Sequence, residues 1–378
     1  MDSGRVFENR ETGRCVTVYF RLFQRGDGEE FCRCIEDFYG GGYPYKEYLS
    51  EEFLLEKCAA GEMTVLCGVT IDGEIISTSA VRKDEDFVGS SLLMLRVVKK
   101  AYRGMGIGKA QEEYLFGYAE GQKEICSLYA DVMTHNSISQ GSLARRGFVY
   151  CGLRLMLYRN PVMVPGLSLP EEGKMSQAVM CRRECDSFGG SLYCPKEHAE
   201  EVRRIYRELG VACRFDGASL GRESENVGLG KQMMECQLDW TLRLPVFEKT
   251  QMGWKEEKEH CSYIWTIQKI GMDFSNKLSD RMGQIGRQEE ETTILCYLNL
   301  RDPSAVYGYD ILRKAGFFFT GLKPLQAEEE YMLLAFTGAQ TIRYEDIHLH
   351  EAGEQLLSYI RLHQKSGFTG RRKGLEDN

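Results

Sequence analysis

Apolar residues along the first 160 positions recur at two spacings, and the alternation between them predicts a mixed α/β fold. Alternate apolar positions are typical of strands, and a spacing of three or four is typical of helices. Asp72-Gly73 separates two apolar runs and predicts a hairpin. The predicted strands are 16–23, 64–71, 74–81, 91–98, 127–133 and a final pair through 158, and the predicted helices are 28–38, 51–60, one beginning at 107, and 137–146.

The rest of this pattern is organised around the stretch from 95 to 109. An apolar run ends at Val98, a basic hinge follows, and Gly104, Gly106 and Gly108 alternate before a helix begins. Glycine allows the backbone to approach a ligand closely, because it has no Cβ. The first turn of a helix has unpaired N–H groups, and its dipole favours anions. The stretch therefore predicts a phosphate-binding loop.

Two common nucleotide motifs do not match this loop. A dinucleotide fingerprint, G-x-G-x-x-G, would need its third glycine one residue after Gly108. A nucleotide P-loop would need glycine where Arg103 stands, and a serine or threonine where Ala110 stands. Both readings are excluded by these residues.

Val98 followed by Arg103-x-x-Gly106-x-Gly108 resembles the acyl-CoA loop of the GNAT superfamily of N-acyltransferases, V-x-P-x-x-R-G-x-G-I-G. Lys100 stands in place of the usual proline. The resemblance implies that the loop amides bind the CoA pyrophosphate and that the preceding strand pairs with pantetheine. The residues implied in cofactor binding are Val97, Val98, Arg103, Gly104, Met105, Gly106, Ile107, Gly108 and Lys109.

A second stretch supports this resemblance. Val132, Asn136 and Gly147-Phe148 match the family pattern V-x3-N-x10-G-F. In the family, the asparagine side chain commonly reaches the pantetheine arm, which adds Asn136 to the predicted cofactor site. Asn136 also suits the N-cap of the helix at 137–146, and the two roles are compatible.

Acyl transfer to an amine needs a base for the amine, donors for the oxyanion and an acid for the thiolate. By resemblance, the amides of Val97 and Val98 are the oxyanion donors. The strand before the loop carries Arg96 rather than the family's usual glutamate, and Leu143 stands where the family has tyrosine. The remaining catalytic candidates are Asp131, His135 and Tyr158. His135 is equally compatible with a loop histidine bonded to the backbone.

The second half contains an apparent, diverged repeat of the first. Placing Gly316-Phe317 over Gly147-Phe148 aligns Leu312 with Leu143 and Gly321 with Gly152. A strand at 294–300 and a helix after Asp302-Pro303 precede this point, and a strand at 331–336 follows. The repeat has no R-x-x-G-x-G loop, and Gly228-Leu229-Gly230-Lys231 is interpreted as a surface turn.

The sequence thus predicts two GNAT-like domains in tandem, of which only the first has an intact acyl-CoA loop. The predicted organisation is a GNAT N-acyltransferase domain at 1–160, a proline-containing linker at 161–180, a degenerate GNAT-like domain at 181–345, and a helix with a basic tail at 346–378.

Composition narrows the class of protein further. Hydrophobic content of 43% and charged content of 28% are those of a soluble globular protein, and a net charge of −8 argues against nucleic-acid binding. No apolar stretch suits a signal peptide or a membrane span, so a cytoplasmic location is expected. The 14 cysteines are scattered without zinc spacing, which predicts reduced thiols and no metal.

The sequence therefore predicts an N-acyltransferase, most simply an N-acetyltransferase. It would move the acyl group directly from acetyl-CoA, or another acyl-CoA, to a primary amine of a small molecule or peptide. The alternative is an acyl-CoA-binding or sensing module without turnover, which the absence of the family's tyrosine and strand glutamate favours.

Overall fold

The computed structural model describes residues 4–43, 45–121, 125–159, 174–184, 190–215, 234–285, 292–323 and 329–372. The chain forms two compact units: the first contains residues 1–130 and 160–169, and the second contains 131–159 and 170–378. Compactness thus groups 131–159 with the C-terminal part, and the domain division at 160 stays a prediction. The Gly228–Lys231 stretch and the prolines of the predicted linker lie outside the described residues.

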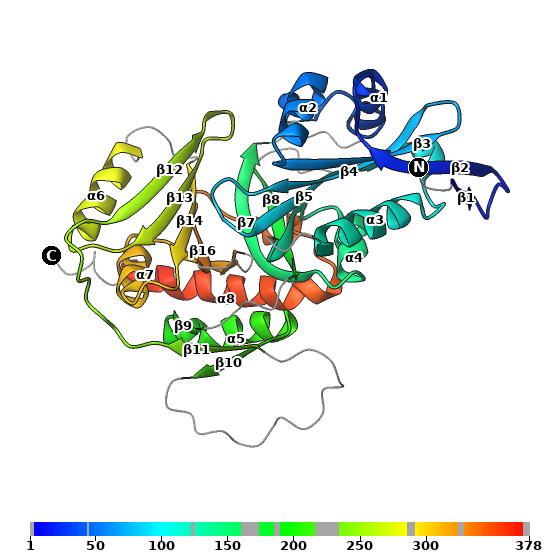
Figure 1. The fold of residues 1–378 in the computed structure, drawn as a ribbon. Helices are drawn as coiled ribbons and strands as arrows, with labels where there is room; N and C mark the ends of the chain where they lie inside the picture. Colours follow the sequence, from blue (N-terminus) through cyan, green and yellow to red (C-terminus); the bar gives the residue numbers. More distant parts are fainter. Residues whose placement is uncertain are drawn as a thin grey trace, which may run out of the picture. The chain divides into compact units, whose positions relative to one another are not determined.

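The first unit is a mixed sheet with helices on both faces (Figure 1). Its strands follow chain order; neighbours are antiparallel except the last pair, which is parallel. The strands are β1 (Arg5–Glu8), β2 (Cys15–Leu22), β3 (Met63–Thr70), β4 (Ile75–Lys83), β5 (Ser90–Val98) and β6 (Ser127–Met133), the end of which belongs to the second unit. The helices are α1 (Gly28–Tyr39), α2 (Glu51–Ala59) and α3 (Ile107–Gly121), with short 3₁₀ turns η1 (Lys46–Leu49) and η2 (Lys100–Tyr102).

Two hydrophobic clusters hold these helices to the sheet. Helix α1 buries Phe31, Cys34 and Ile35 at the spacing of one helical face, and α2 adds Leu54 to the same cluster. Ile107 and Ala110 of α3 belong to the second cluster. The helices therefore cover opposite faces of the sheet. The glycine loop connects the end of β5 to the start of α3.

The second unit contains the larger part of the sheet, in the order β8-β7-β15-β16-β14-β13-β12. A separate parallel sheet has the order β10-β11-β9. The main-sheet strands are β7 (Val149–Arg159), β8 (Lys174–Arg183), β12 (Gln251–Glu257), β13 (Ser262–Lys269), β14 (Thr293–Asn299), β15 (Phe318–Leu322) and β16 (Tyr331–Phe336). The small-sheet strands are β9 (Gly190–Tyr193), β10 (Val211–Phe215) and β11 (Met234–Asp239).

The helices of the second unit are α4 (Ser137–Ala144), α5 (Ala199–Glu208), α6 (Phe274–Ile285), α7 (Ala305–Lys314) and α8 (Glu351–Arg372). The 3₁₀ turns are η3 (Lys196–His198), η4 (Lys258–His260) and η5 (Tyr344–Asp346). None of the helices in the described ranges is long and apolar enough to cross a membrane.

Chain connectivity in the second half follows that of the first. The succession β13-α6-β14-α7-β15-β16 has the element order of β5-α3-β6-α4-β7-β8, and its first two strands are likewise parallel. Gly147 and Gly316 both have positive φ at the end of their helices, at 79° and 101°. The aligned Gly152 and Gly321 are themselves register partners in the β7–β15 pair. These features support the predicted repeat, and its assignment as a second GNAT-like domain remains a proposal.

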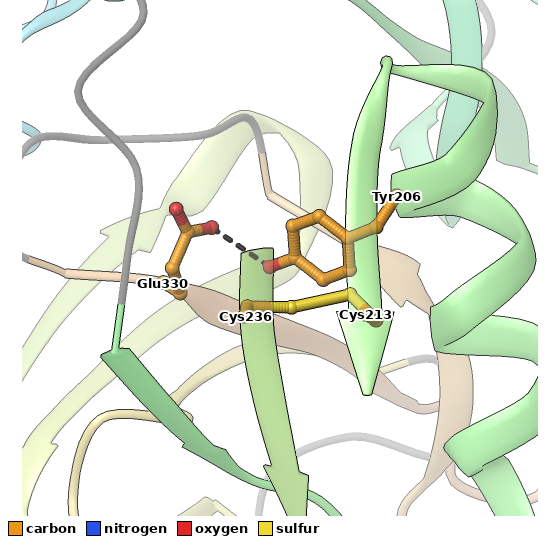
Figure 2. The surroundings of a disulfide bond; sticks show 4 residues. All are labelled: Tyr206, Cys213, Cys236 and Glu330. Atoms are coloured by element: carbon orange, nitrogen blue, oxygen red, sulfur yellow. Dashed lines mark hydrogen bonds between the residues drawn. A yellow bond between two sulfur atoms is a disulfide. The ribbon is translucent and has the colours of Figure 1, made fainter. Parts of the chain in front are cut away.

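Three sequence-based predictions need correction. The predicted strand pair ending at 158 is one long strand, β7. Residues 174–180, predicted as linker, lie in β8, which pairs with β7 and is buried continuously from Met175 to Cys181. Cys213 and Cys236, predicted as reduced thiols, form a disulfide, because they are register partners in β10 and β11 with Cα atoms 4.7 Å apart. Figure 2 shows this bond beside Tyr206, whose hydroxyl donates to Glu330 Oε2 at 3.0 Å.

Candidate functional site

The strand that leads into the glycine loop separates from its parallel neighbour. β5 pairs with β6 only over Ser90–Leu92. Leu95 then adopts φ 54°, an uncommon value for a residue with a side chain, and the β4–β5 register shifts beside it. Thr78 Oγ1 donates to the Leu95 carbonyl at 2.7 Å and holds this bulge. The bulge and the short pairing together open one edge of β5 toward its C-terminal end.

Backbone alternation decides which amide faces that open edge. Lys99 N donates to the Ile76 carbonyl of β4 at 2.9 Å. Because successive N–H groups of a strand point to opposite sides, the N–H of Val98 is directed away from β4. The same alternation turns the N–H of Val97 toward β4. Of the two predicted oxyanion donors, the geometry therefore favours Val98.

The loop itself presents a row of backbone amides. Gly104 and Gly106 have φ values of 77° and 85°, which glycine adopts without strain. Gly106 O accepts the first helical hydrogen bond of α3, from Ala110 N at 3.1 Å. Within the described part of the chain, the amides from Gly104 to Lys109 donate no backbone hydrogen bond. Six consecutive donors at a helix N-terminus form a suitable anion site.

A network of charged and hydroxyl groups fixes the hinge before the loop. Glu74 accepts from Lys99 Nζ at 2.9 Å and from the Tyr102 hydroxyl at 2.8 Å. Burial alone would raise the pKa of Glu74, but these two hydrogen bonds lower it below its ordinary value. Asp37 of α1 accepts from Lys100 N at 2.7 Å. The hinge side chains thus anchor the loop, while its glycine amides stay available.

Two predicted cofactor residues carry positive charge at this loop. Arg103 Nε donates to the Val98 carbonyl at 3.0 Å, and its guanidinium lies 4.9 Å from the centre of the Phe38 ring. The Lys109 side chain is 71% exposed and lies 3.8 Å from Glu113. Both cations stand within a few residues of the free amides, where they complement an anionic group.

An ion pair that the sequence did not predict lies directly behind the loop. Arg96 of β5 donates from Nε to Glu112 of α3 at 2.7 Å, and the two side chains are 15% and 7% exposed. At Gly108, an added Cβ would lie 3.2 Å from Val98 Cγ2, so strand and helix are also in close contact. The sequence contained one indication of this pair. Glu112 lies next to Gln111 on the buried face of α3, and a buried charged side chain needs a partner of opposite charge.

Asn136 occupies the N-cap of α4, as predicted. Its Oδ1 accepts from Ser139 N at 3.1 Å. Gly147 and Phe148 follow α4, and Phe148 N donates to the Leu143 carbonyl at 3.2 Å. The contact of Asn136 with pantetheine stays a prediction.

The three catalytic candidates all lie in the second unit but in different surroundings. Asp131 forms an ion pair with Arg154 of β7. Tyr158 is 8% exposed and packs edge-on against the His260 ring at 4.8 Å. His135 lines a small pocket, and burial, with a contribution from His348, lowers its pKa below the ordinary value. His135 is thus the candidate with access to a pocket.

The described ranges contain no group of three or more histidine, cysteine, aspartate or glutamate side chains placed to hold a metal ion. The described residues place a loop of unpaired backbone amides and an open strand edge in the first unit, and a small pocket lined in part by His135 in the second.

A family profile matches the part of the chain that contains the glycine loop. Residues 29–148 match the sequence profile of the family described as Acetyltransferase (GNAT) family. No curated protein matches the chain.

Three solved structures that the chain resembles each cover less than half of it. The ribosomal-protein-S18-alanine N-acetyltransferase from Escherichia coli is 15% identical, covers 43% of this chain and 92% of its own, and has a TM-score of 0.34. A GNAT acetyltransferase from Streptococcus pneumoniae is 18% identical and covers 44% and 99%, with a TM-score of 0.37. A spermidine N-acetyltransferase chimera from Vibrio cholerae and hSSAT is 13% identical and covers 44% of this chain and 96% of its own, with a TM-score of 0.35.

Proposed function

We propose that residues 29–148, which match the profile of the Acetyltransferase (GNAT) family, form an acetyltransferase domain, and that the protein transfers an acetyl group from acetyl-CoA to a primary amine. Members of this family use acetyl-CoA as co-substrate. The observation that carries the proposal is the row of six amides from Gly104 to Lys109, which donate no backbone hydrogen bond within the described residues. These donors suit the pyrophosphate of CoA, and Arg103 and Lys109 add positive charge beside it.

The open edge of β5 supports the next part of the proposal. The pantetheine arm would extend along β5 beyond Leu92, where β6 no longer pairs with it. The Val98 N–H would then donate to the thioester oxygen and hold the oxyanion as it forms. Asn136 would contact the same arm, in addition to capping α4.

The transfer itself would be direct. The amine nitrogen attacks the thioester carbonyl, a C–N bond forms, and the C–S bond breaks with its electron pair remaining on sulfur. The amine must lose a proton during this step. His135 is our candidate base, since it lines a pocket and burial keeps its imidazole neutral near pH 7. Asp131 and Tyr158 would position neighbouring groups, because Asp131 is held by Arg154 and Tyr158 is buried.

A thiol-release assay tests this function. The purified protein is incubated with acetyl-CoA and a panel of primary amines, among them polyamines, amino acids, aminoglycosides and short peptides. We expect amine-dependent release of CoA together with an acetylated amine detected by mass. CoA binding without amine-dependent release across the whole panel would contradict the enzyme and support the binding or sensing module instead.

A further inference from the structure

The connection between β11 and β12 is an extended segment on the surface of the second unit (Figure 1). No turn or bend interrupts residues 240–246. Three side chains at every second position are largely exposed, Leu242 at 58%, Leu244 at 68% and Val246 at 80%, and we call these three residues the apolar row. Single exposed apolar side chains are ordinary, whereas a contiguous group of them marks a surface that binds a partner.

The side chain between the first two members of the row turns toward the unit itself. The Arg243 guanidinium lies 5.0 Å from the centre of the Tyr193 ring of β9 and pairs with Asp239 at 2.6 Å. Side chains of an extended chain alternate between two sides. The contact of Arg243 with its own unit therefore directs the apolar row toward solvent.

The backbone of this segment has one occupied edge and one open edge. The Phe247 carbonyl accepts from Met272 N at 2.9 Å, and Phe247 forms an isolated bridge with Gly271. Successive residues of an extended chain direct their N–H and C=O groups to alternate edges. Those of the apolar row therefore point away from Gly271. None of them makes a backbone hydrogen bond to any residue in the described ranges.

The open edge lacks the features that usually protect an exposed strand. Natural sheet edges commonly carry lysine or proline, which prevent pairing with another chain. Pro245 has no N–H, but by the same alternation its nitrogen lies at the occupied edge, beside Phe247. The apolar row itself contains neither a charge nor a proline. Its edge is therefore suited to pair with a strand of another chain.

The order of the side chains indicates which chain that is. The apolar row is symmetric about Leu244, so two antiparallel copies place Leu244 opposite Leu244 and Leu242 opposite Val246. In a twofold interface, residue i contacts residue j and j contacts i, so the surface must be complementary to itself. Apolar pairs directly opposite one another also stabilise antiparallel strands. The segment thus meets the requirement for pairing with a second copy.

Charge also favours a second copy at this place. The chain has a net charge of −8, so two copies repel one another over much of their surface. The segment from 239 to 249 is neutral, because Asp239 and Glu248 are balanced by Arg243 and Lys249. Antiparallel pairing also brings the end that carries Lys249 toward the Asp239 end of the second copy.

We propose that the chain forms a twofold-symmetric dimer, in which residues 242–246 of two copies pair as antiparallel strands about Leu244. The open edge supplies the hydrogen bonds, and the apolar row supplies the cross-strand contacts. This contact includes no residue of the acyl-CoA loop, so the dimer does not depend on the proposed function.

Sedimentation velocity at increasing protein concentration tests the dimer on the full chain. We expect the unaltered chain to dimerise reversibly. Leu244→Lys should raise the dissociation constant at least about a hundredfold, because two like charges then face each other across the axis. Leu362→Lys is the matched control, since Leu362 of α8 is 67% exposed, and it should dimerise as the unaltered chain does. If the unaltered chain stayed monomeric at every concentration, the dimer would be refuted and the apolar row left to a strand of a different protein.

A charge exchange tests the position of the twofold axis. Leu244→Lys and Leu244→Glu should each remain monomeric alone, and an equal mixture of the two should form a heterodimer, because opposite charges then meet. Recovery of a dimer on mixing cannot result from misfolding. A mixture that stays monomeric would overturn the proposed pairing. So would a Leu244→Lys variant that dimerises as tightly as the unaltered chain.

Discussion

The Arg96–Glu112 ion pair connects the strand before the CoA loop to the helix after it, so its loss should affect both stability and cofactor binding. Glu112→Gln keeps the shape of the side chain but removes the charge that faces Arg96. Both side chains are largely buried, and removing one charge of a buried ion pair costs about 3–5 kcal/mol. At roughly 2–4 °C per kcal/mol for a domain of this size, the melting temperature should fall by about 10 °C.

Differential scanning fluorimetry measures this shift, and a surface pair provides the control. Arg33 lies 2.5 Å from Glu29, but these side chains are 58% and 78% exposed. Glu29→Gln should therefore change the melting temperature far less than Glu112→Gln does, because solvent screens an exposed pair. We also expect KM for acetyl-CoA to rise in Glu112→Gln. Equal melting shifts for Glu112→Gln and Glu29→Gln would refute the argument that the buried pair holds the loop.

Two further predictions concern the second unit. Burial lowers the pKa of His198 to about 3. The stability that its neutral form contributes is therefore present above pH 6.5 and is lost as the pH falls toward 3, by on the order of 4 kcal/mol. The urea midpoint of His198→Gln should fall less steeply over this range than that of the unaltered chain, and equal slopes would contradict the argument. Reducing the Cys213–Cys236 disulfide, which spans 23 residues, should destabilise the unit by about 3 kcal/mol, whereas Cys213→Ser should melt identically with and without a dithiol. If a dithiol still lowered the melting temperature of Cys213→Ser, the prediction about the disulfide would be contradicted.

The parts of the fold that the sequence predicted well are those determined by local patterns. The strand at 127–133 and the strand at 331–336 have the predicted bounds, because a short, largely apolar run favours a buried strand locally. The small sheet of β9, β10 and β11 was missed. Its strands pair across long separations, and the Cys213–Cys236 bond depends on that register. Sequence spacing alone does not determine which cysteines meet.

The same distinction applies to the candidate site. The glycine loop was predictable because Arg103, Gly104 and Gly106 lie within four residues and each has a local physical role. Glu112 was missed because its role depends on contact with Arg96, 16 residues earlier. The pocket around His135 was not predictable at all, since residues 341–347 contribute its walls from more than 200 positions away.

The central claim is that the amides from Gly104 to Lys109 bind CoA, and Gly106→Asp tests it most directly. The substitution places a carboxylate beside the predicted pyrophosphate. Gly13→Asp is the matched control, because Gly13 has a similar φ of 69°, and an added Cβ at either position meets nothing within 4 Å.

The measurement is the melting shift produced by CoA at about 100 times its dissociation constant. Binding at this level stabilises a protein by about 2.7 kcal/mol, which corresponds to several degrees. We predict that the unaltered chain and Gly13→Asp keep this shift and that Gly106→Asp loses it. A full CoA shift in Gly106→Asp would contradict the account and place the cofactor site elsewhere.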